Sequence, residues 1–312
     1  MSSAATLPAP SSLPPPARAV ATPTAAPTST PTTAITASIL RIYAVFQRSP
    51  SLGPSPSVNA AFSELVSLCI RPYDSATAAA ILEDRRVRAI ANALRAKCSE
   101  GEFLLEAWWA NRILAEEGRG EEAWTSLRAF PYYQNYMDLS RLELSALAAV
   151  HPAPIGSLAF IGSGPLPLTS ICLSTLLSPP PRRIHNIDMS PQAISVSRSL
   201  CARLGGAAAR LSFECADAKE VALEEFDVVV LAGLVGGSAN EKREILRSVV
   251  RRCGNGALLM LRSAHGVRRL LYQEVELAEL QALGLDVLLV VHPWNEVVNS
   301  VVVCRVRERG RL

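Results

Sequence analysis

Apolar residues recur with helical spacing from about residue 36 to residue 150. Ile39, Ile42, Val45 and Phe46 are spaced so that they form one apolar face of a helix. Further segments with the same period, separated by prolines, cover 58–68, 77–97, 101–117 and 139–149. The pattern predicts an all-helical domain of five or six helices over residues 36–150.

Short apolar runs replace the helical period after residue 150. The predicted strands cover 157–161, 185–188, 211–215, 226–231, 257–262, 286–292 and 297–306. The helical segments between them lie near 167–176, 190–204, 240–251 and 267–282. This alternation indicates a parallel, doubly wound sheet, while the last two strands must pair antiparallel because the loop between them is too short for a crossover helix. The predicted fold is α/β, with a Rossmann-like doubly wound sheet over 151–312 behind the N-terminal all-helical domain.

Residues 1–35 differ in composition from the rest of the chain. They are almost entirely Ala, Ser, Thr and Pro, with eight prolines and no acidic residue. Proline at this density breaks helices, and such a composition cannot form a core. We therefore expect a disordered tail, which lacks the apolar stretch of a secretory signal.

The composition excludes several classes of protein. Of 312 residues, 49% are hydrophobic, which is ample for a packed core, yet no apolar run approaches the ~20 residues of a membrane helix. The net charge is only +3, and the arginines are scattered among acids, unlike the basic stripe of a nucleic-acid binder. The seven cysteines include no CxxC pair. This argues against a disulfide scaffold or a zinc site and favours a reducing compartment, so we expect a cytoplasmic protein.

A glycine-containing turn follows the first predicted strand. Gly162-Ser163-Gly164 lets the backbone approach a ligand closely, although many folds turn with the same Gly-x-Gly pattern. The third glycine of the dinucleotide fingerprint is absent, and prolines occupy positions 165 and 167. Both departures argue against a pyrophosphate bound at the N-terminus of the next helix.

Two aspartates end the second and third predicted strands. Asp188 is placed to accept hydrogen bonds from both ribose hydroxyls of a nucleoside, or is simply a helix N-terminal acid favoured by the dipole. Asp217 is placed to receive an adenine amino group, or is a turn residue. Ala218, beside it, and Leu231, at the end of the fourth strand, complete the expected nucleoside-binding set. With the glycine turn and the antiparallel final pair, these residues predict an S-adenosylmethionine site of the class I methyltransferase type, rather than an NAD site, at the carboxyl ends of the strands.

Several blocks of the sequence resemble the nicotianamine synthase family. They occur in the family's order between about residues 39 and 306 and are Pro54–Asn59, Cys98–Glu100, Leu105–Ala107, Phe130–Tyr136, Phe160–Pro167, Arg262–Gly266 and Val297–Val301. The resemblance implies a helical domain over a Rossmann-like domain. It also implies condensation of three S-adenosylmethionine molecules into nicotianamine, a metal chelator, with release of methylthioadenosine. S-Adenosylmethionine is then the substrate, and no metal is expected. Trp108-Trp109 departs from the His-Tyr that the family more often has there.

Candidate catalytic groups lie in the helical domain. Glu102 and Glu106 share one helix face, and Glu106 lies in an apolar stretch. A carboxylate buried there needs a partner or a raised pKa, which suits proton acceptance from an ammonium group; a solvated helix glutamate is the alternative. The resemblance favours the catalytic role. A tyrosine cluster follows Pro131 and either packs the two domains together or supplies a hydroxyl for the attacking amine, with Tyr132 preferred and Tyr133 the rival.

Arg262 ends the fifth predicted strand. Its guanidinium either pairs with a substrate carboxylate or forms a surface ion pair. Two other functions fit the same residues. One is a small-molecule S-adenosylmethionine-dependent methyltransferase with the helices as a lid, and the other is a non-catalytic S-adenosylmethionine-binding module. The sequence does not decide between a monomer and a homo-oligomer.

Overall fold

The computed structural model describes residues 32–308. Six helices come first: α1 (Thr32–Arg48), α2 (Pro56–Ile70), α3 (Ser75–Glu83), α4 (Arg85–Ala115), α5 (Glu121–Arg128) and α6 (Tyr133–Val150). The predicted tail, 1–35, lies outside the described residues except for 32–35, which open α1. Ile35 is buried there, so the helical part begins earlier than predicted.

The strands and their connecting helices follow α6. They are β1 (Ser157–Ile161), α7 (Leu168–Leu176), β2 (Arg183–Asp188), α8 (Pro191–Leu204), a short 3-10 helix η1 (Ala208–Arg210), β3 (Ser212–Cys215), β4 (Val228–Leu231), α9 (Ala239–Arg252), β5 (Leu258–Ser263), a second 3-10 helix η2 (Gly266–Leu270), α10 (Leu277–Ala282), β6 (Leu285–Val291) and β7 (Ser300–Val306).

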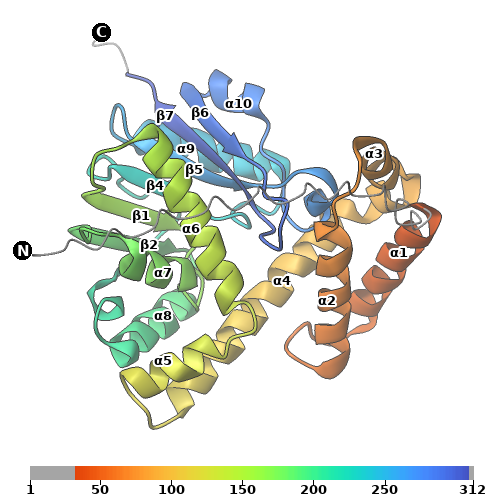
Figure 1. The fold of residues 1–312 in the computed structure, drawn as a ribbon, viewed down its shortest axis with the longest axis horizontal. Coiled ribbons are helices and arrows are strands. Elements are labelled where there is room, and N and C mark those ends of the chain that lie inside the picture. The colour runs from red at the N-terminus through yellow and green to blue at the C-terminus, as the bar shows by residue number, and fades with distance from the viewer. Residues whose placement is uncertain (1–31, 309–312) are drawn as a thin grey trace, which may run out of the picture. The chain divides into compact units, whose positions relative to one another are not determined.

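The seven strands form one sheet in the order β3-β2-β1-β4-β5-β7-β6 (Figure 1). The first five are parallel to one another, whereas β7 pairs antiparallel with both β5 and β6. Alternate side chains of β1, β4 and β5 enter two cores, one against α6, α7 and α8 and the other against α9 and α10. The α/β doubly wound fold and the antiparallel final pair are therefore confirmed.

Helix α4 runs without a break through a position where the sequence predicts a gap. The prediction of separate helices over 77–97 and 101–117 is wrong, because α3 ends at Glu83 and α4 covers 31 residues. Gly101 lies inside α4 against the ring of Phe62 in α2, where a Cβ would come within 2.2 Å of the ring. Glycine here permits close packing of two helices rather than ending one.

Both ends of α4 are held by the part of the chain that carries the sheet. Near its start, Arg95 donates a hydrogen bond to the carbonyl of Arg269 in η2, at 2.8 Å. Just after its end, Arg203 of α8 donates to the carbonyl of Gly118, at 3.2 Å. The predicted division into domains at about residue 150 stays a prediction.

The predicted helix over 267–282 is wrong. Its place is taken by η2 and α10, with an irregular segment between them. Buried Arg268 donates to the carbonyls of Ile70 and Asn295, and the backbone N–H of Val275 donates to Ser263 Oγ at 2.9 Å. These contacts with other segments replace a continuous helical ladder. Within residues 32–308, no helix is long and apolar enough to cross a membrane.

Candidate active site

A cavity of about 1510 Å³ lies at the carboxyl ends of the parallel strands. The turns after β1, β2, β3 and β4 line one side, and residues of α2, α4, α6 and 295–299 line the other. Pockets for drug-sized ligands usually measure roughly 300–1,000 Å³. The cavity therefore has room for more than one small molecule.

The glycine turn forms the wall of this cavity beside β1. Gly162 and Gly164 have φ of 80° and 65°, a region that favours glycine. The N–H of Gly164 donates to Asp188 Oδ2 at 2.9 Å, and the N–H of Ser190 donates to Asp188 Oδ1 at 2.9 Å. The Asp188 carboxylate thus holds the turn and the start of α8. It also lines the cavity, where its remaining lone pairs are open to a ligand.

The other predicted nucleoside contacts divide into two groups. Ser163, Asp217 and Ala218 line the cavity, as the sequence predicts. Asp217 accepts from the backbone N–H of Lys219 at 2.8 Å and forms an ion pair with its side chain at 3.6 Å. Leu231 does not line the cavity, because the alternation along β4 directs its side chain into the core against α9. The residues just after it, 232–237, form that wall instead.

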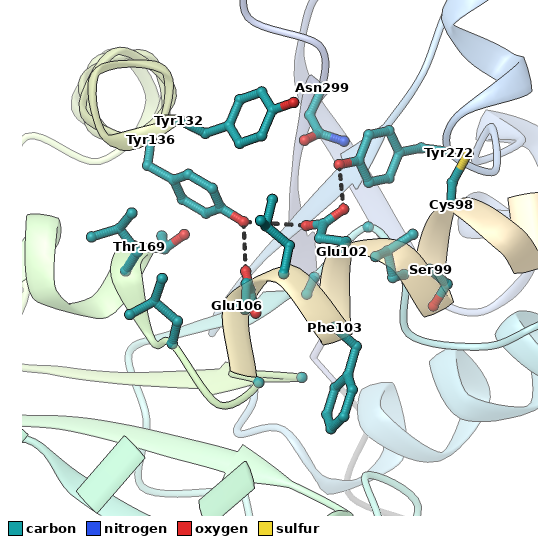
Figure 2. A pocket seen from close by; sticks show the side chains of 18 of the residues that line it. Cys98, Ser99, Glu102, Phe103, Glu106, Tyr132, Tyr136, Thr169, Tyr272 and Asn299 are labelled. Atoms are coloured by element: carbon teal, nitrogen blue, oxygen red, sulfur yellow. Dashed lines mark hydrogen bonds between the residues drawn. The ribbon is translucent and has the colours of Figure 1, made fainter. Parts of the chain in front are cut away.

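Two glutamates and two tyrosines form a hydrogen-bonded chain in the middle of the cavity (Figure 2). The hydroxyl of Tyr136 lies 2.9 Å from Glu106 Oε1 and 3.2 Å from Glu102 Oε1. The hydroxyl of Tyr272 donates to Glu102 Oε2 at 2.8 Å. The second oxygen of Glu106, Oε2, faces the glycine turn, since a Cβ on Gly164 would lie 2.7 Å from it. Glu106 therefore lies between a tyrosine and the turn.

Burial governs the protonation of this chain. It raises the pKa of the Glu106 carboxyl well above the ordinary value, and the neighbouring Glu102 raises it further, although the Tyr136 hydrogen bond acts in the opposite direction. Burial also raises the pKa of Glu102, against the hydrogen bonds of Tyr272 and Tyr136. The pKa of the Tyr136 hydroxyl is raised by burial and by both carboxylates, so this phenol keeps its proton. The pair of carboxylates consequently favours holding a proton.

Tyr136, rather than Tyr132 or Tyr133, is the tyrosine hydrogen-bonded to Glu106. Tyr132 precedes the first turn of α6, and Tyr136 comes one turn into the helix, where its ring points toward α4 (Figure 2). Tyr132 lines the same cavity without a hydrogen bond to either glutamate, and Tyr133 is not part of the wall. Tyr132 as the hydroxyl that positions the attacking amine stays a prediction, whereas the structure adds Tyr136 as the hydrogen-bond partner of Glu106.

Arg262 is buried and paired within the protein rather than at the surface. Its Nε donates to Glu143 Oε1 at 2.7 Å, and its Nη2 donates to Glu143 Oε2 at 3.2 Å and to Thr169 at 2.8 Å. Although desolvation lowers the pKa of Arg262, the Glu143 carboxylate raises it above the ordinary value. Arg262 also lines the cavity, and its Nη1 has no hydrogen bond within residues 32–308. The predicted pairing of the Arg262 guanidinium with a substrate carboxylate stays a prediction, and only Nη1 is available for it.

Two buried polar atoms in the cavity wall lack a hydrogen-bond partner among the described residues. They are Ser163 Oγ in the glycine turn and Asn299 Nδ2 beside Tyr272 (Figure 2). A buried polar group without a partner costs about 1–3 kcal/mol. Both atoms are therefore available for a hydrogen bond to a polar ligand in the cavity.

The charges of the cavity wall favour a cationic ligand. Seven carboxylates line it, namely Glu102, Glu106, Asp138, Asp188, Asp217, Glu241 and Glu296. The two cations of the wall, Lys219 and Arg262, are paired with carboxylates. Among the described residues, no group of three or more His, Cys, Asp or Glu side chains is placed to hold a metal ion.

Comparison with known proteins identifies the family. The family model described as "Nicotianamine synthase protein" matches residues 28–310. Nicotianamine synthase 9 of Hordeum vulgare is 38% identical over 274 residues, covering 87% of this chain and 78% of the relative. The chain belongs to the nicotianamine synthase family. Nicotianamine synthase 2 of Arabidopsis thaliana is 35% identical, with 87% and 83% of the two chains covered.

The fold of this family member matches that of a solved structure. MtNAS in complex with MTA and tNA superposes with a TM-score of 0.73 and 24% identity, covering 88% of this chain and 98% of that one. MtNAS has also been solved in complex with S-adenosylmethionine, at the same TM-score. At this identity the comparison supports the fold, including both the helices and the sheet.

Sequence reasoning missed three contributors to the site in this nicotianamine synthase family member. Tyr272 and Asn299 come from segments far from α4 in the chain, and no local period connects them to the glutamates. Tyr136 belongs to the tyrosine cluster that was singled out, but its position one turn into α6 decides its role. The sequence signal for Asn299 is that it lies inside the block Val297–Val301, which resembles the family.

Asp188→Ala is expected to weaken S-adenosylmethionine binding at least tenfold in this family member. Each hydrogen bond to a charged group contributes about 1.5–3 kcal/mol, and the variant also releases the N–H of Gly164. Calorimetric titration measures the affinity. The control is Asp286→Ala, which removes an aspartate of β6 that pairs with Arg307 outside the cavity. Unchanged affinity in a folded Asp188→Ala protein would contradict the ribose assignment.

Buried Lys242 makes the stability of the fold depend on pH. Its Nζ is buried and donates to the carbonyl of Gly233, in the cavity wall, at 3.0 Å. Burial lowers its pKa from 10.5 to about 8. Between about pH 8 and 10.5 the unfolded chain binds this proton and the folded chain does not. The free energy of unfolding that Lys242 contributes therefore rises with pH across this range, and it is lost once pH has fallen through 8.

We expect this contribution, about 3 kcal/mol, to appear as the difference in pH dependence between the wild-type protein and Lys242→Met, because the buried thiols that titrate in the same range are common to both. Denaturant titrations at several pH values measure the free energy of unfolding. Lys97→Met, which changes a lysine in a surface ion pair with Glu100, is the control. The same pH dependence in both variants would show that burial of Lys242 is not its source.

Proposed function

We propose that this chain condenses the aminocarboxypropyl groups of three S-adenosylmethionine molecules into nicotianamine, releasing three methylthioadenosines. One observation carries the proposal. The buried Glu106 carboxylate is held by Tyr136 on one side and faces the glycine turn on the other. This arrangement puts a base with a raised pKa beside the expected position of the nucleoside donor.

Orientation decides which bond to sulfur is broken. The sulfonium of the donor activates three carbons, and a methyltransferase presents the methyl carbon to its nucleophile. Here the attacking group is the amine of a second substrate, and the carbon attacked is the methylene of the donor's aminocarboxypropyl chain. The cavity has room for both molecules, so it can hold the amine and the methylene in near-attack geometry.

Glu106 makes the amine reactive. An ammonium has no free lone pair, so Glu106 takes one proton and becomes the neutral acid. The amine nitrogen then bonds to the methylene carbon, and the C–S bond breaks with its electron pair remaining on sulfur. The sulfonium charge disappears and a secondary ammonium forms, so charge balances. Closure of the azetidine ring repeats the same attack within one molecule.

Other groups of the wall support binding. The excess of carboxylates favours the cationic sulfonium and ammonium groups. Asp188, Asp217 and the glycine turn face the nucleoside, while Ser163 Oγ and Asn299 Nδ2 can bond to polar atoms of the substrates. Tyr136 orients the base, and Tyr132 remains a candidate for contact with the amine.

A single incubation tests the proposal. Purified protein given only S-adenosylmethionine is expected to consume it and to release methylthioadenosine, three per nicotianamine. Mass spectrometry with carboxyl-labelled substrate follows the label into the larger product. Adenosylhomocysteine as the main nucleoside product would instead establish a methyltransferase. Absence of turnover in a folded protein that binds the substrate would favour a binding module.

A further inference from the structure

Repeated condensation requires Glu106 to lose its proton between steps. Each new C–N bond needs one ammonium proton removed, and three bonds form per product. If Glu106 takes every proton, it must be ionised again before each following step while ligands still occupy the cavity. The surroundings of Glu106 contain one group suited to receive the proton.

That group is Glu102, one helical turn earlier on α4. The Tyr136 hydroxyl is within hydrogen-bond distance of both carboxylates, at 2.9 Å from Glu106 and 3.2 Å from Glu102. It has one proton for two acceptors, so when it donates to one carboxylate its oxygen is open to a proton from the other. Figure 2 shows the hydroxyl lying between the two side chains.

We propose that Glu102 receives the amine-derived proton from Glu106 through the Tyr136 hydroxyl, which restores the Glu106 carboxylate for the next condensation. This inference rests on the proposed function, because the proton concerned is the one that the attacking amine loses. Glu102 acts through Tyr136 and does not itself touch the reacting atoms, so it is a positioning and relay residue.

The transfer balances. After protonation, the Glu106 carboxyl turns about its Cγ–Cδ bond so that its O–H faces Tyr136. That O–H bond breaks as the proton passes to the phenol oxygen, and the phenol's own proton passes to Glu102 Oε1. Glu106 ends as a carboxylate, Tyr136 is unchanged, and Glu102 ends as a neutral acid. Glu102 then releases this proton to solvent water as methylthioadenosine leaves, so that it can accept the next one.

The groups around Glu102 fit this role. Tyr272, from the segment after η2, donates to Oε2 and fixes the carboxylate, and Cys98 lies one turn away on α4. Arg262 is the nearby cation, but it forms its ion pair with Glu143. Glu102 and Glu106 therefore have no ion pair of their own among the described residues, although the charge of Arg262 lowers the pKa of both. Burial raises the pKa of the Glu102 carboxyl, so Glu102 can hold the proton that Tyr136 passes to it.

The test separates the first condensation from the later ones. Wild-type protein, Glu102→Gln and Tyr136→Phe are each mixed with S-adenosylmethionine. Mass spectrometry then measures the methylthioadenosine released in the first turnover and the ratio of the one-condensation intermediate to nicotianamine. Glu100→Gln makes the same chemical change on the same helix, at a surface ion pair, and is the matched control.

In Glu102→Gln we expect the first methylthioadenosine to form within about threefold of the wild-type rate. Later condensations should slow by about tenfold or more, so the intermediate accumulates. The solvent deuterium effect on the later steps should change in the variant, whereas Glu100→Gln should match the wild type. If Glu102→Gln does not fold, Tyr136→Phe decides. Its first condensation also slows, because Tyr136 orients Glu106, but its later condensations should slow further, so the intermediate should accumulate.

Two results overturn the relay. One is an unchanged ratio of intermediate to product in folded Glu102→Gln. The other is equal slowing of all three condensations, which indicates structural support alone. A wild-type protein that releases no methylthioadenosine refutes the proposed function itself and the relay with it. This failure is distinct because no intermediate forms in any of the proteins.

Discussion

Glu106→Gln is expected to slow methylthioadenosine release by about 10²- to 10⁴-fold while S-adenosylmethionine binding is retained. Glutamine keeps the volume and can still accept the hydrogen bond from Tyr136, but it cannot take a proton from the amine. In the wild type, the raised pKa of Glu106 sets the acid limb of the rate profile. The rate should therefore fall as pH decreases through a value above the ordinary carboxyl pKa of 4.5.

Steady-state kinetics measures the rate of methylthioadenosine release, and calorimetric titration measures the affinity for S-adenosylmethionine. Glu100→Gln is again the suitable control because it changes an exposed glutamate of the same helix. Turnover at the wild-type rate in Glu106→Gln, from about pH 6 to 9, would show that this carboxylate is structural. Loss of binding and rate together would assign it to substrate recognition instead.

The largest effect on stability is expected at Glu143. This carboxylate is fully buried and holds buried Arg262 through two hydrogen bonds. Glu143→Ala leaves the guanidinium without its counter-charge, which costs about 3–5 kcal/mol when one partner of a buried pair is removed. Denaturant titration should show this loss, with a fall of several degrees in the melting temperature.

A double variant provides the comparison. Glu143→Leu with Arg262→Met removes both charges and fills a similar volume, so it should recover most of the stability that Glu143→Ala loses. If Glu143→Ala unfolds with nearly the wild-type free energy, the ion pair is not a major support of the interface between α6 and β5. A double variant no more stable than the single one would point to the lost volume as the cause.

The parts of the site that the sequence predicts are those set by local spacing. The glycine turn and Asp188 follow from their positions at the ends of two neighbouring parallel strands, and the fold places them in contact. Glu102 and Glu106 are predicted to share a face because they are four residues apart on one helix. These relations need no knowledge of how distant segments pack.

The remaining parts depend on packing between distant segments. The pairing of Arg262 with Glu143 joins residues separated by 119 positions, and nothing in their neighbours indicates it. The choice of Tyr136 depends on where α6 begins, which the three tyrosines that follow Pro131 leave undetermined. The two helical segments expected over 77–97 and 101–117 are one helix, in which Gly101 allows close contact with Phe62 of α2.

The attachment of α4 at both ends limits how members of this family can be recombined. The helix that carries both glutamates is hydrogen-bonded to η2 near its start and to α8 just beyond its end. A chimera that takes residues up to about 150 from one parent and the rest from another therefore inherits α4 from one lineage and both of its anchors from the other. Chimeras that exchange α4 together with α8 and η2 keep both contacts within one lineage, whereas a crossover near residue 150 divides them between two.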